Sequence, residues 1–88
     1  MENQKVFTVE VVVDETETTT DAKAVTTIGA ATFGGWGRAR RNPSDPNVPH
    51  IGEELATARA LSDLAHRLLD AAADAIEERE GHPVRVHD

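Results

Sequence analysis

Residues 51–80 read IGEELATARALSDLAHRLLDAAADAIEERE, and the fold class depends most on this segment. Its apolar side chains recur every three or four residues, the period of one helix face. They form a single stripe, made of Ile51, Leu55, Ala58, Leu61, Ala65, Leu68, Leu69, Ala72 and Ile76. The opposite side carries charged residues, namely Arg59, Asp63, Arg67, Asp70 and Asp74. Such a stripe is typical of a helix that packs on a core, so we expect one long helix over about residues 51–80.

The two ends of this predicted helix carry different signals. Glu53 and Glu54 lie in its first predicted turn, where carboxylates complement the positive end of the helix dipole. Gly81 is typical of a helix stop. Three glutamates lie just before that stop, at Glu77, Glu78 and Glu80. Because a helix C-terminus favours cations, we expect the last turn to fray unless a partner covers it.

Three strands are predicted ahead of the helix, over residues 5–14, 21–29 and 32–41. In the first, apolar Phe7, Val9 and Val11 alternate with Val6 and more polar residues. Residues 15–21 contain no apolar side chain and predict a solvated hairpin loop. The second strand alternates more weakly, but its β-branched residues favour an extended chain.

Glycines mark the third predicted strand. One face carries Phe33, Gly35, Gly37 and Ala39, and the other carries Gly34, Trp36, Arg38 and Arg40. Glycine inside a strand allows another backbone to approach closely, so we expect the helix on the Phe33 face. A proline-rich connector over residues 42–50 and an extended tail over residues 81–88 complete the chain. The predicted fold class is α+β, a three-stranded antiparallel meander packed on one long C-terminal helix.

Composition limits the function classes. A chain of 88 residues has room for one small domain, and 39% apolar residues with 28% charged is typical of a globular one. The net charge of -7 disfavours general binding to nucleic acid and predicts no DNA partner. Without cysteine, disulfides and thiolate metal sites are excluded. The sequence shows neither a basic leader nor a long apolar run, so we expect a cytoplasmic protein and no membrane contact.

Two interpretations of the exposed sheet face remain open. Trp36 with Arg38, Arg40 and Arg41 could stack a base and contact phosphates, as single-stranded RNA platforms do. Alternatively, the same face packs against a second copy of the chain through Val6, Val12, Val25 and Trp36. Burial of one Trp and three Val outweighs exposed ion pairs, which contribute under about 1 kcal/mol each. The balance favours the dimer.

Catalytic and metal-binding patterns are weak. His66 and Asp70 are four residues apart on the helix, but a metal site needs three or four ligands. Ser62, Asp63 and His66 supply triad residue types on one helix, without a nucleophile elbow. No phosphate-binding glycine motif is present. We therefore predict no enzyme activity, no metal and no cofactor.

Three motifs resemble a small actinobacterial family of unknown function. They are the turn beginning at Asn42, the Ile-Gly-x-Glu-Leu helix start at residues 51–55, and the Ala-Arg-Ala-Leu-Ser-Asp-Leu run at 58–64. The resemblance covers roughly residues 5–85. It implies a fold similar to double-stranded-RNA-binding domains, dimerisation, an association with stress or dormancy, and a shape similar to ribosome hibernation factors. From the residues and the resemblance together, we expect a non-enzymatic homodimeric interaction protein, with ribosome or RNA binding as the alternative.

Overall fold

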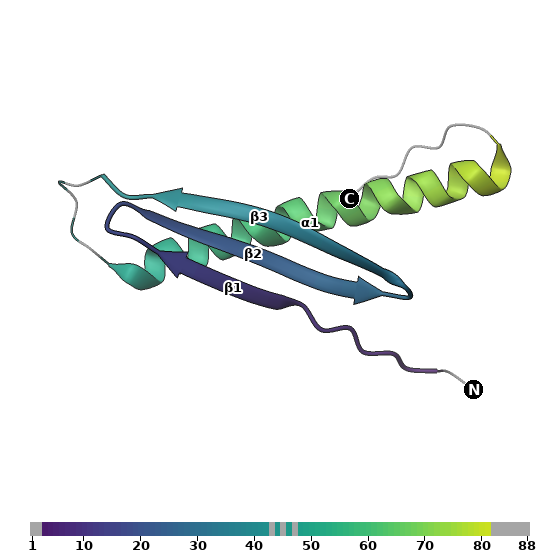
Figure 1. The fold of residues 1–88 in the computed structure, drawn as a ribbon, viewed down its shortest axis with the longest axis horizontal. Helices are drawn as coiled ribbons and strands as arrows, with labels where there is room; N and C mark the ends of the chain where they lie inside the picture. Colours follow the sequence, from purple (N-terminus) through teal and green to yellow (C-terminus); the bar gives the residue numbers. More distant parts are fainter. Residues whose placement is uncertain (1–2, 43, 45, 47, 82–88) are drawn as a thin grey trace.

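One antiparallel sheet and one long helix make up the protein. We describe it from a computed structural model that covers residues 3–42, 44, 46 and 48–81. The elements follow in the order β1 (Glu10–Glu15), β2 (Thr19–Ile28), β3 (Ala31–Arg40) and α1 (Pro49–Glu80). The strands lie in the order β1-β2-β3, and α1 crosses one face of the sheet (Figure 1). The predicted fold class is confirmed. From residue 82 on, the predicted tail lies outside the described residues.

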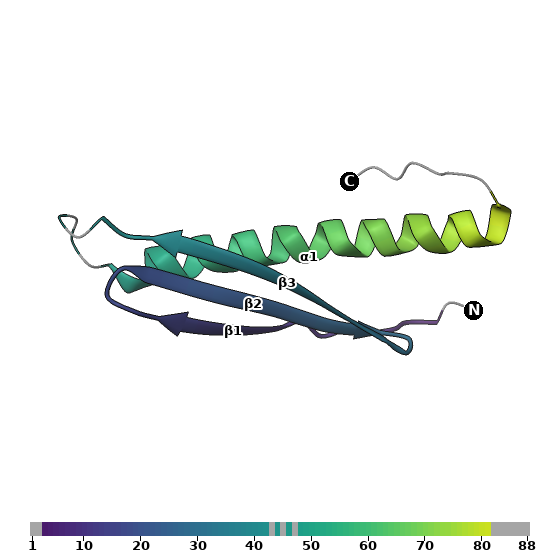
Figure 2. The same cartoon turned by 45° about the horizontal axis from the view of Figure 1, so that its top comes forward.

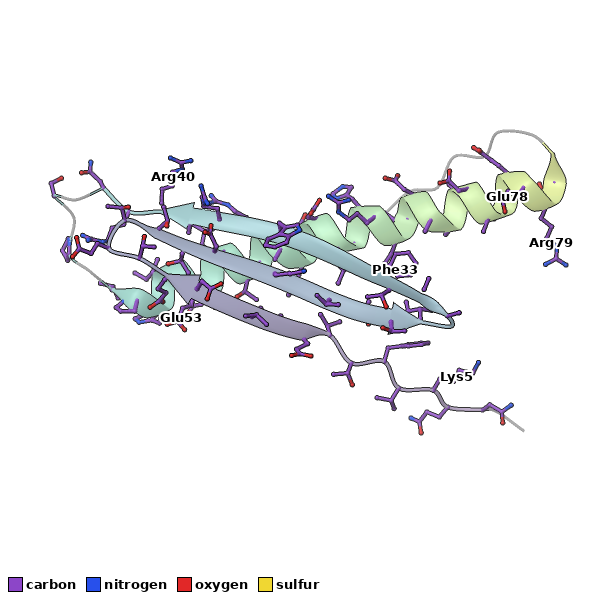
Figure 3. All side chains as sticks on the ribbon, viewed as in Figure 1. Lys5, Phe33, Arg40, Glu53, Glu78 and Arg79 are labelled. Carbon is purple, nitrogen blue, oxygen red and sulfur yellow. The ribbon has the colours of Figure 1, made fainter. Side chains whose placement is uncertain are left out.

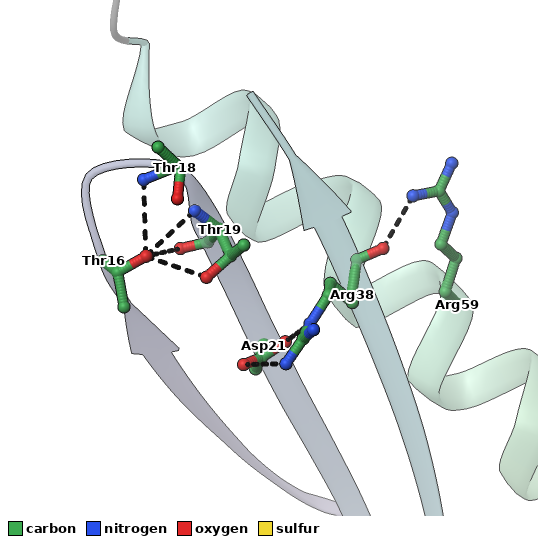
Figure 4. Close-up of polar contacts among 6 residues, drawn as sticks. All are labelled: Thr16, Thr18, Thr19, Asp21, Arg38 and Arg59. Carbon is green, nitrogen blue, oxygen red and sulfur yellow. Dashed lines mark hydrogen bonds and ion pairs between the residues drawn. The ribbon is translucent and has the colours of Figure 1, made fainter. Parts of the chain in front are cut away.

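The β1–β2 connection is shorter than the polar run predicts, because the strands continue through most of that run. Only residues 16–18 lie between them. The Thr16 hydroxyl oxygen accepts hydrogen bonds from the backbone N–H groups of Thr18 (3.3 Å) and Thr19 (3.0 Å) (Figure 4). Threonine side chains that bond the backbone locally form tight turns. The β2–β3 connection needs only Gly29 and Ala30, with Gly29 at a φ of 64°, as type II′ hairpins require.

β1 begins at Glu10, five residues later than the alternation predicts. The reason lies on β2, where the buried Thr26 hydroxyl donates a 2.8 Å hydrogen bond to the Thr8 carbonyl. The Thr8 carbonyl thus bonds to a side chain instead of the β2 backbone, and the backbone pairing of β1 with β2 ends next to it. Phe7 and Val9 remain more than two-fifths exposed in the segment before β1.

The interface between sheet and helix is built from small residues. Its buried members are Ala22, Ala24, Ala39, Ala56, Ala60 and Leu64. A Cβ atom added at Gly35 would lie 2.8 Å from Leu64 Cα, and one at Gly37 would lie 2.8 Å from Arg59 Cβ. Since neither position has room for a methyl group, the backbones of α1 and β3 are in close contact at these two glycines. The prediction that the Phe33 face of the third strand meets the helix is confirmed.

The rotation of α1 about its own axis differs from the one that its apolar stripe predicts. Ala56, Ala60 and Leu64 face the sheet, whereas Ile51 is 55% exposed and Leu55 is 43% exposed. The physical reason is the close approach at Gly35 and Gly37, which leaves space for alanine and none for a row of larger side chains. The expectation that the whole Ile/Leu stripe packs on the core is therefore wrong: Leu68 does pack against the core, whereas Ile51, Leu55, Leu61 and Ile76 are exposed.

The ends of α1 also differ in detail from the expectation. The helix starts at Pro49, so its first turn contains no acidic residue, and no side chain caps it. At the other end, the N–H of Gly81 donates a 2.7 Å hydrogen bond to the Glu77 carbonyl, with Gly81 at a φ of 77°. A helix of 32 residues is about 48 Å long, whereas a ten-residue strand spans about 33 Å. Figure 2 accordingly shows α1 extending beyond the β2–β3 turn.

Candidate interaction surfaces

Among the described residues, no element covers the sheet face away from α1, which we call the open face, and Trp36 lies in its middle. The register places Val12, Lys23 and Trp36 side by side across the three strands. Trp36 is 60% exposed and Val12 is 50% exposed, so the centre of this face presents apolar surface. The Lys23 ammonium lies over the indole, 4.8 Å from the ring centroid, in a cation–π contact. This contact holds the indole against the sheet and covers part of one ring face.

The next row across the open face is charged. Asp14, Asp21 and Arg38 lie side by side on the three strands. The Arg38 guanidinium donates hydrogen bonds to both Asp21 carboxylate oxygens, at 2.5 and 3.1 Å (Figure 4). This hydrogen-bonded cation lowers the pKa of Asp21. Arg38 is therefore already committed to a partner within the sheet.

The three arginines that the sequence groups together do not point the same way. Arg38 and Arg40 project from the open face, and Figure 3 shows Arg40 extending away from the end of β3. Arg41 lies past the strand end, and its guanidinium donates to the Glu17 carbonyl at 2.5 and 3.1 Å. The predicted cluster thus reduces to Trp36, Arg38 and Arg40 on one face.

The predicted dimer face is brought together in part. Val12 and Val25 lie on the open face with Trp36, and Val25 is directly opposite Glu10 and Gly34. Val6 lies before β1 and is 87% exposed, outside the sheet. The expectation that Val6 belongs to this face is wrong, because the ladder that would carry it ends at Glu10.

Side chains of α1 cover the outer edge of β3. The backbone N–H of Trp36 donates a hydrogen bond to Asp63 Oδ2 at 2.9 Å, and Arg59 Nη1 donates one to the backbone carbonyl of Arg38 at 2.7 Å. Asp63 also pairs with Arg67 at 3.2 Å. The Trp36 N–H and then Arg67 lower the pKa of the Asp63 carboxyl. Sequence periodicity missed Arg59 and Asp63 because it assigns them to the solvent side of the helix. Each directly precedes a residue that faces the sheet, Ala60 or Leu64, and this adjacency is the signal that could have placed them beside β3.

The outward side of α1 is a second apolar surface. We call it the outer stripe and define it as the apolar residues Ile51, Leu55, Ala58, Ala65, Leu69, Ala72 and Ile76 together with the polar Ser62, which lies between Ala58 and Ala65. All its members are exposed except Leu69, which is half-buried. Within the described residues, no strand covers this side, since the sheet occupies the alanine side of the helix. The outer stripe carries larger apolar side chains than the buried side does.

A pocket of about 370 Å³ lies where the β1–β2 hairpin meets the start of α1. Its apolar walls come from Ala39, Pro46, Val48, Pro49, Ile51 and Leu55. Glu15 lines the same pocket and lies against Glu53 of α1. The pKa of Glu15 is raised, first by lost hydration and then by the hydrogen bond and the charge of Glu53.

The residues that resemble catalytic or metal-binding sets are engaged otherwise. Asp63 binds the Trp36 backbone and Arg67, and His66 Nδ1 lies 2.9 Å from the Ser62 carbonyl oxygen on its own helix. The described residues contain no group of three or more side chains that could hold a metal ion. His82 and His87 lie outside the described residues. In the part of the chain that the structure describes, no helix is long and apolar enough to cross a membrane.

Comparison with known proteins agrees with this geometry. Residues 5–85 match the Rv2632c-like family model. An uncharacterised protein of Mycobacterium tuberculosis is 45% identical over 80 residues, covering 91% of this chain and 85% of that protein. The uncharacterised protein Rv2632c of the same species is 40% identical over 80 residues, covering 91% and 86%. The crystal structure of Rv2632c superposes with a TM-score of 0.85 at 38% identity, covering 93% of this chain and 98% of that one. By sequence and by fold, this chain belongs to the Rv2632c-like family.

Proposed function

We propose that this chain is a non-enzymatic, homodimeric interaction protein whose open sheet face contacts a macromolecular partner. The observation that carries the proposal is Trp36, a large aromatic side chain that is 60% exposed at the centre of an uncovered sheet face. An exposed aromatic with apolar neighbours typically marks a protein-binding surface. Val12 and Val25 extend the apolar centre, and Arg38 and Arg40 form a charged rim.

The engagement of the polar side chains supports a binding role over a catalytic one. Asp63 and Arg59 hold the edge of β3 to the helix, and Arg38 holds Asp21 across two strands. Asp63 and Arg59 thus join sheet and helix, and Arg38 and Asp21 join two neighbouring strands. These contacts fix the shape of the open face, which supports its use as a docking surface.

A protein partner suits this face better than RNA. Glu10 and Asp14 lie on the same face as Trp36, and Arg38 already neutralises Asp21. Lys23 covers part of the indole, which reduces the area on which a base could stack. A mixed-charge rim around an apolar centre is the usual composition of a protein interface.

Ribosome or RNA binding is the second candidate, and Arg40 favours it. Arg40 lies on the Trp36 face, close enough to Asp21 that, besides the Arg38 hydrogen bond, its charge also lowers the pKa of that carboxyl. The family resemblance adds the expected link to stress, dormancy and ribosome hibernation. RNA contact predicts salt-sensitive co-sedimentation with ribosomes, which the combined change of Arg38, Arg40 and Arg41 to Glu abolishes. Arg79→Glu, a charge reversal far along α1, is the control; equal co-sedimentation of both variants would contradict RNA binding through this face.

Light scattering and a binding experiment test the main proposal. We expect a mass of twice 9.5 kDa in solution. Partners captured from stationary-phase mycobacterial cells with the wild-type protein should be lost with Trp36→Ala and retained with Ile28→Ala, a control in the same sheet. A single-chain mass at high micromolar concentration would contradict the homodimer. Capture that is unchanged by Trp36→Ala would contradict the open face as the binding surface.

A further inference from the structure

We propose that the outer stripe of α1 pairs antiparallel with the outer stripe of a second copy of this chain. This inference rests on the proposed homodimer and names the surface through which the two copies meet. It leaves the Trp36 face of each copy free for another partner. Three independent features of α1 support it.

The first feature is the spacing of the outer stripe. Its members, from Ile51 to Ile76, alternate steps of four and three residues without interruption. Steps of four and three define the a and d positions of a heptad repeat, the pattern of helices that pair along their length. The sheet-facing residues Ala56, Ala60 and Leu64 occupy positions b, f and c of that repeat. The sheet therefore uses the side of α1 that a paired helix leaves free, and two copies can pair without their sheets colliding.

The second feature is the match of side-chain sizes in the antiparallel orientation. A two-fold axis between Asp63 and Leu64 places these residues opposite each other: Ile51 and Ile76, Leu55 and Ala72, Ala58 and Leu69, Ser62 and Ala65. Each leucine then faces an alanine and the two isoleucines face each other, so two small side chains meet only at the central Ser62–Ala65 levels. In a parallel pair every residue would face its own copy, and alanine would face alanine at three levels. Facing small residues leave voids, which destabilise a packed interface.

The third feature is the charge at the helix ends. The first turn of α1 has no acidic residue and no side-chain cap, whereas Glu77, Glu78 and Glu80 lie in its last turns with Arg79. Figure 3 places Glu78 and Arg79 at the opposite end of α1 from Glu53. In one helix this arrangement opposes the dipole. In an antiparallel pair, the acidic end of each helix lies beside the positive end of the other.

The pocket at the start of α1 fits the same arrangement. Ile51 and Leu55 belong to both the pocket wall and the outer stripe. The antiparallel register brings Ile76 of the second copy over Ile51, at the mouth of the pocket. The paired length from Ile51 to Ile76 is about 38 Å. The second copy thus accounts for the outer stripe, the pocket and the charge of the helix ends together.

Because the chain has no cysteine, introduced thiols test this register directly. A disulfide requires Cα atoms within about 7 Å. Leu55→Cys combined with Ala72→Cys should give covalent dimers on mild oxidation, because the two positions face each other across the seam. Leu55→Cys alone and Ala72→Cys alone should crosslink at least tenfold less, since the two copies of either position are about 25 Å apart along the axis. Circular dichroism of each variant checks that α1 stays folded, and light scattering reports the mass independently.

The possible outcomes separate this inference from the proposed homodimer. If only the variant with both Leu55→Cys and Ala72→Cys crosslinks and the mass is that of two chains, the result supports the homodimer and the antiparallel helix interface. Strong crosslinking of Leu55→Cys alone would establish a parallel pair and overturn the antiparallel one. A two-chain mass with efficient crosslinking of Trp36→Cys and none of the double variant would keep the homodimer and overturn the helix interface. A single-chain mass would overturn both.

Discussion

The backbone N–H of Trp36 donates a 2.9 Å hydrogen bond to the Asp63 carboxylate, joining the exposed strand β3 to the helix α1. An edge strand presents unpaired backbone groups that can recruit another strand. Asp63 satisfies one of these groups, and Arg59 satisfies the Arg38 carbonyl on the same edge. The helix therefore binds two backbone groups on one edge of the sheet and covers one face of it.

Asp63→Ala should lower the thermal midpoint and promote aggregation through the freed β3 edge. The pKa of Asp63 is lowered in the folded protein, so its stabilising effect is complete above its ordinary value of 3.8 and is lost as pH falls through the lowered value. Thermal unfolding between pH 2 and pH 7 measures this contribution. Asp70→Ala, an exposed aspartate on the same helix, serves as the control; equal acid sensitivity of the two variants would contradict the role of Asp63.

Gly37→Ala should destabilise the fold by about 1–3 kcal/mol, because an added methyl group pushes the helix away from β3. The new Cβ would lie 2.8 Å from Arg59 Cβ and closer still to the Ala56 and Ala60 backbone. Gly34→Ala is the matched control in the same strand, since its nearest neighbours lie 3.9 Å away on the open face. Urea unfolding measures the free energy of unfolding of both variants. Equal values for Gly37→Ala and Gly34→Ala would contradict the close approach of α1 to β3.

Glu53→Gln should stabilise the protein at neutral pH. The pKa of Glu15 is raised in the folded state by lost hydration and by Glu53, so folding becomes less favourable as pH rises above the ordinary value of 4.5. Removal of the Glu53 charge relieves its repulsion of the Glu15 carboxylate, so the free energy of unfolding should fall less as pH rises. The free energy of unfolding, measured from pH 4 to pH 7, should show the flattening for Glu53→Gln and not for Glu54→Gln.

Trp36 is the only tryptophan and reports on the open face directly. If the two copies meet through α1, its emission maximum should stay red-shifted and constant as the dimer dissociates on dilution. As a positive control, Ile51→Trp in a Trp36→Phe background should shift its emission over the same concentration range. A dilution-dependent shift of Trp36 itself would place the interface on the sheet.

The fold class could be predicted from the sequence because its apolar residues recur with two different periods, one typical of strands and one typical of helices. The alternation along the strands and the three-to-four spacing after Pro49 separate sheet from helix. Gly35 and Gly37 also predicted the helix-facing side of β3 correctly. These signals are local, so they can be read from neighbouring residues.

The rotation of α1 could not be predicted in the same way. The helix has an alanine side and an Ile/Leu side, and periodicity favours the larger side chains as the core. The sheet packs against the side that carries Ala56, Ala60 and Leu64, because Gly37 and Gly35 bring the helix backbone too close for large side chains at positions 56 and 60. The pairing of Arg38 with Asp21 and of Asp63 with Trp36 depends on register and rotation, which no local pattern specifies.

Light scattering of Ala65→Glu tests the helix interface most directly. Ala65 is exposed in the single chain, so the substitution leaves the fold intact, yet it lies beside the proposed two-fold axis, where it brings two new carboxylates together. We expect a dissociation constant raised by more than tenfold, about 1.4 kcal/mol, and a single-chain mass of 9.5 kDa where the wild type and Ala30→Glu show twice that value. An Ala65→Glu protein that keeps the two-chain mass would contradict the pairing of α1 with its copy.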